Sequence, residues 1–430
     1  MHNFTRFCAI AALAAIAGCA APPPPAPPAP PPLPPAPLAA NPLDRDQPSY
    51  LRLPGLPDGT PVRVGIILPF SAGAPGTRAL AQSMLKAAQL ALFDAGNKSV
   101  LLMTADEGNG GAGAAAAAAQ QLLAQGAEVI IGPLFGPSVQ AVAPIARDRG
   151  IPVLAFSTER SVAGNGTYLL SFLPQNEVRR VVRYAAANGH HVYAALVQQT
   201  AYGDVVQDAF RDSVQASGGV IADVEHFTGN AGAVAAPAGA VAKSGADAVL
   251  IAQGGVMLKA LASTLSFDGA TKDKVKLLGT GLWDDDTTLA REAALEGSWY
   301  AAPTPGADAQ FIAKYRGTFG TAPAQLASLA YDAVSLVALL SQGTPYHRFT
   351  QKALMDPNGF GGVNGIFRFN PDGTSERGLA VLEMTHDGPV VVSPAPTTFQ
   401  PRSASSEVPR SRDGAATAPR ASRSARRRSS

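Results

Sequence analysis

Residues 126–158 limit the folds open to this chain more than any other stretch. They hold two short, continuous apolar runs, at 129–131 and 151–156, with apolar residues at helical spacing between them. Continuous apolar runs suit strands that are buried on both faces, as in a parallel sheet. The stretch therefore predicts a strand–helix–strand unit whose strands both end in small polar residues. In open α/β sheets ligands bind beyond the carboxyl ends of the strands, so we expect the function there.

The same alternation continues through the body of the chain, which we expect to begin near Pro61. Further strands are predicted at 62–69, 99–104, 168–173, 191–197, 220–226, 247–252, 275–279 and 297–302. Helices are predicted at 77–95, 112–125, 177–188, 204–217, 234–243, 256–265, 287–295, 309–319 and 324–341. Such alternation is typical of parallel sheets with right-handed crossovers. It is too long for one sheet, so the sequence predicts an α/β protein of two lobes with a cleft between them.

The end of the body has a different pattern. Residues 365–369 and 378–384 flank a turn that contains Pro371 and Gly373, which predicts a β-hairpin. A last short strand is predicted at 390–392.

Residues 1–18 read as a secretory signal, because Arg6 precedes an apolar run, 7–17, that is too short to span a bilayer. The signal ends in Ile16-Ala17-Gly18-Cys19, which resembles the bacterial lipobox. That resemblance implies lipid attachment at Cys19, whereas the alternative is an ordinary signal with a chance cysteine. The other cysteine, Cys8, leaves with the signal, so no disulfide is expected.

The segments that flank the body are of low complexity. Residues 22–37 contain twelve prolines, which favours a polyproline II spacer of about 50 Å at about 3.1 Å per residue. The formal net charge is +2, but residues 402–430 hold eight Arg against two acidic residues, and this Arg-rich tail is predicted to be disordered. The body is therefore mildly acidic, and we expect no nucleic-acid partner.

Motifs of catalysis and metal binding are few. Residues 108–113 match G-x-G-x-x-G, but no acidic residue ends the next strand, so a Gly-rich loop entering a helix is the better interpretation. His190-His191 lacks spaced partners, and Asp284-Asp285-Asp286 is expected to cap a helix. No G-x-S-x-G, H-E-x-x-H or Walker A lysine occurs. The sequence thus predicts no enzyme, no cofactor and no metal.

Polar and aromatic residues at strand ends are the candidate ligand-binding residues. Ser138 lies at the start of a predicted helix, where free N–H groups and the helix dipole suit an anion; it either binds a ligand or caps the helix, and capping is favoured. Ser157 and Thr158 end the next strand and are expected to converge on the same ligand. Tyr202 and Trp283 follow two other strands, where they either close over a ligand or pack between the lobes.

In their order and spacing, these segments resemble the type I periplasmic-binding-protein superfamily, which includes the Leu/Ile/Val-binding receptors. Within it the likeness is greatest to bacterial lipoproteins described as penicillin-binding protein activators. The matching segments are 64–70, 126–158, 202–204, 278–284, 299–303, 329–334 and 359–373.

The resemblance implies two Rossmann-like lobes joined by three crossovers. The implied parts are the signal, 1–18; the lipidated linker, 19–60; lobe 1, 61–173 plus 302–350; lobe 2, 174–301 plus 351–394; and the tail, 395–430. It also implies that Ser138, Ser157 and Glu159 form one wall of the cleft and Tyr202 the other.

Two positions depart from the pattern of amino-acid receptors. Gly279-Thr280-Gly281-Leu282-Trp283 stands where a carboxylate usually holds the ligand's ammonium, and Glu159 stands where a small hydroxyl residue is common. An amino acid would then lack a partner for its ammonium, unless Glu159 or an Asp of 284–286 supplies one.

Two functions follow from these features. The favoured hypothesis is a non-enzymatic envelope lipoprotein that regulates a peptidoglycan synthase, a penicillin-binding protein. Ala20 after Cys19 favours the outer membrane by the rules of the family. The alternative is a substrate-binding protein that delivers a small amino-acid-like ligand to the permease of an ABC importer, by closing its lobes.

Overall fold

The computed structural model describes residues 50–51, 53, 61–284, 286–345 and 347–399. The predicted signal, Cys19, the Pro-rich linker, Asp285 and the tail beyond residue 399 lie outside these residues. Within the described part, no helix is both long and apolar enough to cross a membrane. The predicted α/β architecture with two parallel-stranded lobes is confirmed.

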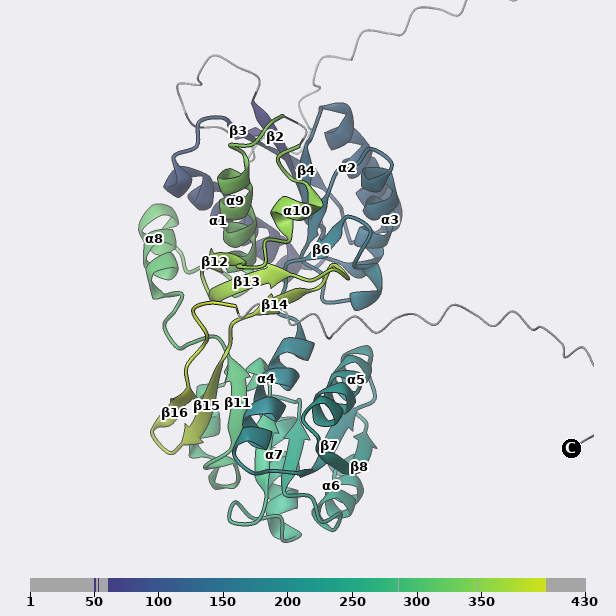
Figure 1. Cartoon of the computed structure of the whole chain (residues 1–430), viewed down its shortest axis with the longest axis vertical. Helices are drawn as coiled ribbons and strands as arrows, with labels where there is room; N and C mark the ends of the chain where they lie inside the picture. The colour runs from purple at the N-terminus through teal and green to yellow at the C-terminus, as the bar shows by residue number, and fades with distance from the viewer. Residues whose placement is uncertain (1–49, 52, 54–60, 285, 346, 400–430) are drawn as a thin grey trace, which may run out of the picture. The chain divides into compact units, whose positions relative to one another are not determined.

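The first lobe is built on a six-stranded sheet. Its strands, in spatial order, are β1 (Tyr50–Leu51), β3 (Val100–Asp106), β2 (Val62–Leu68), β4 (Val129–Ile131), β5 (Val153–Ala155) and β6 (Thr167–Leu169). All pairs are parallel except β1 with β3. One face packs on helices α1 (Pro75–Ala95) and α9 (Ala327–Leu340), and the other on α2 (Ala112–Ala124) and α3 (Gly136–Arg147) (Figure 1).

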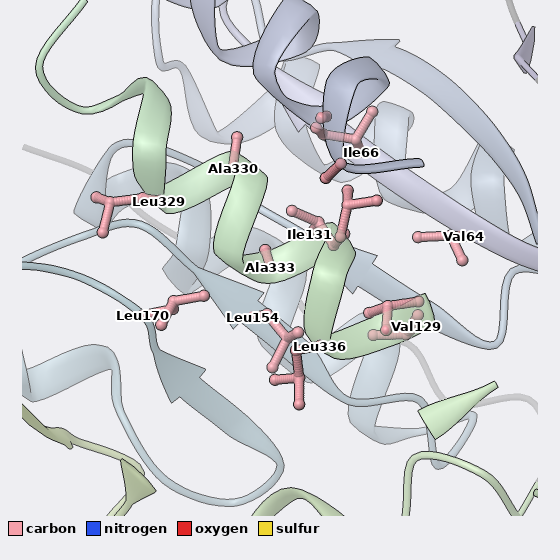
Figure 2. Close-up of a cluster of buried hydrophobic side chains, with 14 of the residues drawn as sticks. Val64, Ile66, Val129, Ile131, Leu154, Leu170, Leu329, Ala330, Ala333 and Leu336 are labelled. Atoms are coloured by element: carbon pink, nitrogen blue, oxygen red, sulfur yellow. The ribbon is translucent and has the colours of Figure 1, made fainter. Parts of the chain in front are cut away.

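Burial on both faces explains the continuous apolar runs of these strands. Ile66 belongs to the cluster under α1 and α9, whereas the next residue, Ile67, belongs to the cluster under α2 and α3. Successive side chains of a strand point to opposite faces, so both faces must be apolar. Figure 2 shows the first cluster, in which Ala333 of α9 lies close to Ile131 of β4.

The second lobe is built on a seven-stranded sheet. Its strands, in spatial order, are β16 (Gly388–Ser393), β15 (Ala380–Thr385), β11 (Trp299–Ala302), β10 (Lys276–Gly279), β9 (Ala248–Ile251), β7 (Val192–Gln198) and β8 (Val220–Phe227). The pairs β11–β15 and β15–β16 are antiparallel, and the others are parallel. Helices α4 (Pro174–Ala187) and α5 (Ala201–Ala216) pack on one face, and α6 (Ala235–Ala242) and α7 (Gly255–Phe267) on the other.

One predicted helix is absent. Residues 287–295 form two short 3-10 helices, η4 (Thr287–Arg291) and η5 (Ala293–Leu295), rather than one α-helix. Glu292 between them has extended backbone angles, which interrupt the helix. Asp286 caps η4 by accepting the backbone N–H of Thr288 at 2.9 Å, as expected for its acidic cluster.

The predicted C-terminal hairpin is wrong in its second strand. β12 (Phe360–Gly362), β13 (Gly365–Phe369) and β14 (Ser375–Arg377) form a separate three-stranded antiparallel sheet. The predicted partner of β13, residues 378–384, instead supplies β15 of the second lobe, where it pairs with β11. This pairing buries the apolar side chains of Val381 and Leu382 in the two faces of that lobe's core. The predicted last strand, 390–392, lies within β16.

The boundary between the lobes also differs from the expectation. Leu354 of α10 (Gln351–Leu354), Phe367 and Phe369 are fully buried in the cluster under α9, so residues up to about Arg377 pack with the first lobe. Only β15 and β16 join the second sheet. The resemblance had implied that residues 351–394 all belong to the second lobe. Helix α8 (Ala309–Phe319) packs beside α1 in the first lobe.

Candidate functional site

Helix α3 provides one wall of the candidate site. It begins at Gly136, directly after β4, with Pro137 in its first turn, where a missing backbone N–H costs nothing. Ser138 is fully buried in the same turn. Phe135 occupies the cap position, and Ser138 therefore does not cap the helix, contrary to the favoured interpretation.

The start of α3 is instead approached by Glu107, which the sequence analysis missed. Glu107 follows β3, is fully buried, and its Oε1 accepts the backbone N–H of Leu134 at 3.0 Å. Burial raises the pKa of Glu107 to about 7, although the Ser138 hydroxyl and the Leu134 N–H both favour its charged form. The sequence offered one sign of this residue: Glu107 follows a predicted buried strand. A carboxyl group is rarely buried, so the sequence alone did not predict Glu107 inside the lobe.

Ser157 and Glu159 reach the same point from the end of β5. The Ser157 hydroxyl accepts the backbone N–H of Glu159 at 3.1 Å, and Glu159 Oε1 accepts the hydroxyl of Ser161 at 2.6 Å. Glu159 Oε2 lies where a side chain on Gly136 would be, so only glycine fits there without displacing it. Thr158 is exposed. Two carboxylates of the chain itself therefore lie at the end of α3 that was predicted to suit an anion.

The second lobe contributes a cluster around Tyr202. Tyr202 is half-buried at the start of α5, and its hydroxyl lies 3.3 Å from the hydroxyl of Thr280. Glu177, in the first turn of α4, accepts the backbone N–H of Gly281 through Oε2 at 3.0 Å. Burial and then the nearby charge of Glu177 raise the pKa of Tyr202, which keeps this phenol a neutral hydrogen-bonding group.

Trp283 lies in the core of the second lobe, not at the cleft. Only 1% of its surface is exposed, its ring packs against Gly279, and its Nε1 donates to the carbonyl of Ile251 at 3.2 Å. The 3-10 turn η3 (Gly281–Trp283) turns the indole under the sheet, where it contacts Tyr300. The prediction that Trp283 binds a ligand is therefore not supported by its position.

A cavity of about 470 Å³ is lined by residues of both lobes. The second lobe supplies Glu177, Tyr202, Gly281, Leu282 and Asp284. The first lobe supplies Phe311, Ile312, Gln325, Leu326, Ser328 and Asn364. Phe172, Pro174, residues 303–306 and Asp308 lie between the lobes. Three lining residues are acidic, and no Lys, Arg or His occurs among the described residues that line it.

Of the predicted ligand-binding residues, only some line this cavity. Tyr202 lines it, but Ser138, Ser157, Thr158 and Glu159 do not. Ser138 lies in the first turn of α3, Glu159 lies over Gly136 and is hydrogen-bonded to Ser157, and Tyr202 lines a cavity that includes none of these residues. Glu177 and Asp284 are additional lining residues, and Asp284 also accepts the Tyr300 hydroxyl at 2.9 Å.

The other polar clusters have structural partners. His190 pairs with Asp247 at 3.3 Å, and the Gly-rich loop leads into α2 with Gly111 at the cap position. Searching the described residues reveals no group of three or more His, Cys, Asp or Glu side chains that could hold a metal ion.

A family described as "Periplasmic binding protein" matches residues 61–389. No curated protein matches the sequence.

Solved structures give further matches. A protein from Rhodospirillum rubrum, described as a branched-chain amino acid ABC transporter, has a TM-score of 0.68 at 19% identity and covers 77% of this chain and 100% of its own. A leucine-binding protein from Thermotoga maritima has a TM-score of 0.53 at 19% identity, with 78% and 98% covered. A solute-binding protein of an ABC transporter from Rhodopseudomonas palustris, in complex with 3,4-dihydroxybenzoic acid, has a TM-score of 0.55 at 18% identity, with 79% and 97% covered. At these identities the likeness concerns the fold.

Proposed function

Because this chain belongs to the periplasmic binding protein family, we propose that it is the solute-binding protein of an ABC importer for a small organic cation. Membership of the family implies a periplasmic location. Most of the similar structures are described as parts of ABC transporters, which supports a permease as the partner.

The observation that carries the proposed ligand class is the charge of the cavity lining. Glu177 and Asp284 line a cavity that holds no basic side chain among its described residues. A cation that leaves water requires a carboxylate, whereas an anion would face uncompensated negative charge. The rings of Tyr202, Phe172 and Phe311 add apolar surface and aromatic faces for an ammonium group.

The start of α3 lies outside this cavity, and its surroundings do not favour an anion either. The free N–H groups at a helix start are the usual protein feature for a carboxylate or phosphate. Here Glu107 accepts the N–H of Leu134, just before the helix, and Glu159 lies over Gly136, the first residue of α3. A ligand carboxylate at this point would therefore meet the exposed carboxylate of Glu159, which disfavours an anion there.

We expect the ligand to close the lobes, because residues of both lobes line the cavity. Tyr202 belongs to the second lobe and Phe311 to the first, so a ligand in contact with both binds the closed arrangement more tightly than the open one. Such differential affinity shifts the population toward the closed form.

A thermal-shift panel tests the proposal. Putrescine, choline, leucine and benzoate are each added at 1 mM, on the order of a hundred times an affinity in the 10 µM range, which would stabilise the fold by about 2.7 kcal/mol. We expect a shift with the cations alone. Glu177→Gln, which retains an acceptor for the Gly281 N–H, should abolish the shift, and Glu296→Gln, at an exposed ion pair with Lys272, should retain it. A shift with benzoate, or an unchanged shift in Glu177→Gln, would contradict the proposal.

The second candidate is the regulator of a peptidoglycan synthase, anchored in the outer membrane through lipid on Cys19. The observation that favours it is that the chain's own carboxylates, Glu107 and Glu159, lie at the α3 start, where a receptor would offer N–H groups to its ligand. Pull-down and glycan-polymerisation assays with purified bifunctional synthases test it. Binding with a changed rate, and no thermal shift in the panel, would favour this function over transport. Absence of both effects excludes it.

A further inference from the structure

The described part of the chain continues beyond the second lobe. After β16, the edge strand of the seven-stranded sheet, residues 394–399 return toward the three-stranded sheet of the first lobe. We infer that these six residues form a strap, a fourth connection between the lobes that limits how far they separate. The inference does not depend on which ligand the cavity binds.

The first end of the strap is held by the second lobe. Arg180 of α4 donates from Nη2 to the Ser393 hydroxyl at 2.7 Å and to the carbonyl of Pro394 at 3.4 Å. Its Nε donates to the carbonyl of Leu379 at 2.8 Å. Ala395 packs against the core of the second lobe. One arginine therefore joins the strap to the point where the chain enters β15.

The other end of the strap is held by the first lobe. The ring of Phe399 lies 4.5 Å from the guanidinium carbon of Arg368, within the range of a cation–π contact. Arg368 is itself buried and fixed by Glu376 at 2.8 Å and by the carbonyl of Pro357 at 3.1 Å. Gly359 makes room for the ring, since a Cβ there would lie 2.7 Å from Phe399 Cε2. Phe399 thus packs against an arginine that two other groups of the first lobe hold in place.

The strap is short and stiff. Only four residue steps separate Ala395, which contacts the second lobe, from Phe399, which contacts the first. A fully extended chain spans at most about 3.6 Å per residue, so these four steps can span no more than about 14 Å. Pro394 and Pro396 fix two of the backbone φ angles, and Pro396 packs on Gly378 at the third crossover. Wide opening of the lobes therefore requires Phe399 to leave Arg368.

Hydrogen exchange of the full chain, measured by mass spectrometry, tests the strap. In Phe399→Ala, peptides that cover the crossovers near residues 169–174, 302–309 and 377–380 should exchange about fivefold faster than in the wild type, because the lobes open more often. Phe399→Tyr retains the ring and should exchange as slowly as the wild type. Val391→Ala, at an exposed position of β16, is the matched control for loss of an apolar side chain and should have no effect.

Two shortened chains distinguish the strap from the residues beyond position 399. A chain that ends at Phe399 should exchange at the wild-type rate, whereas a chain that ends at Ser393 should match Phe399→Ala. Peptides in the cores of the two lobes should exchange equally in Phe399→Ala and Phe399→Tyr, so that the effect at the crossovers reports lobe motion and not global unfolding. Equal exchange in these two variants, or in the two shortened chains, would overturn the inference.

Discussion

Glu107 is a fully buried carboxyl group, and its protonation should affect stability. Its pKa is about 7 in the folded chain, compared with an ordinary value of 4.5, mainly because burial disfavours the charged form. The folded state therefore binds this proton more tightly than the unfolded state. Accordingly, the contribution of Glu107 to the free energy of unfolding falls as the pH rises from about 4.5 to about 7.

The variant Glu107→Gln should remove this dependence. A pKa difference of this size is worth about 3 kcal/mol, so the variant should gain up to that amount relative to the wild type at pH 8, and little at pH 4. Glutamine keeps an acceptor for the Leu134 N–H and remains neutral. Urea denaturation at pH 4 to 8 provides the measurement, with Glu296→Gln as an exposed control. Parallel stability curves for the wild type and Glu107→Gln would contradict the role of burial.

Alanine substitutions at two glycines, Gly136 and Gly279, would show how tightly α3 and β10 are packed. Gly136 begins α3 and Gly279 ends β10, and an added methyl group would overlap a neighbouring side chain at both. At Gly136 the neighbour is the flexible end of Glu159, whereas at Gly279 it is the buried ring of Trp283. The same substitution should therefore have different costs.

We expect Gly136→Ala to cost less than about 1 kcal/mol, because Glu159 can move into solvent, and Gly279→Ala to cost about 3 kcal/mol through overpacking. Chemical denaturation measures both. A double variant, Gly136→Ala with Glu159→Ala, should be at least as stable as Gly136→Ala alone. If Gly136→Ala proved as costly as Gly279→Ala, the flexible placement of Glu159 would be wrong.

At the scale of the whole molecule, Arg377 connects segments that lie far apart in sequence. Its Nε donates to the carbonyl of Ser171 at 3.2 Å in the first crossover, and its guanidinium lies 4.7 Å from the ring of Phe172. Its Nη1 is 3.7 Å from Asp332 Oδ2 of α9, and both side chains are 1% exposed. Burial raises the pKa of Asp332 to about 6, and the charge of Arg377 opposes this rise.

Removal of one member of this pair should cost more than removal of both. Arg377→Met leaves Asp332 buried without its counter-charge, so we expect a loss of about 3–5 kcal/mol. The double variant Arg377→Met with Asp332→Asn should recover at least about 1 kcal/mol of that loss, since no charge is then buried. Urea unfolding of the four chains in this cycle gives the coupling energy. Additive losses would show that the two groups do not interact.

The amino-acid sequence alone was enough to predict the fold class and the starts and ends of most strands and helices. Those features depend on local hydrophobic periodicity: both Ile66 and Ile67 must be apolar in a strand that is covered on both faces. It also predicted that Ser138 lies at the start of a helix and that Ser157 and Thr158 follow a strand, whereas the grouping of Ser138, Ser157 and Glu159 came from the family resemblance. Tyr202 was placed correctly after a strand, but the cavity that it lines includes none of these residues.

The features that depend on distant partners were visible only in the folded molecule. Glu107 binds a backbone N–H of residue 134, and its burial comes from the packing around it. Trp283 turned into the core because Gly279 leaves space for its ring. Residues 380–385 pair with β11, more than seventy positions earlier, in preference to the adjacent β13. In each case the sequence nearby does not determine the arrangement. The partner that each segment meets in the folded core does.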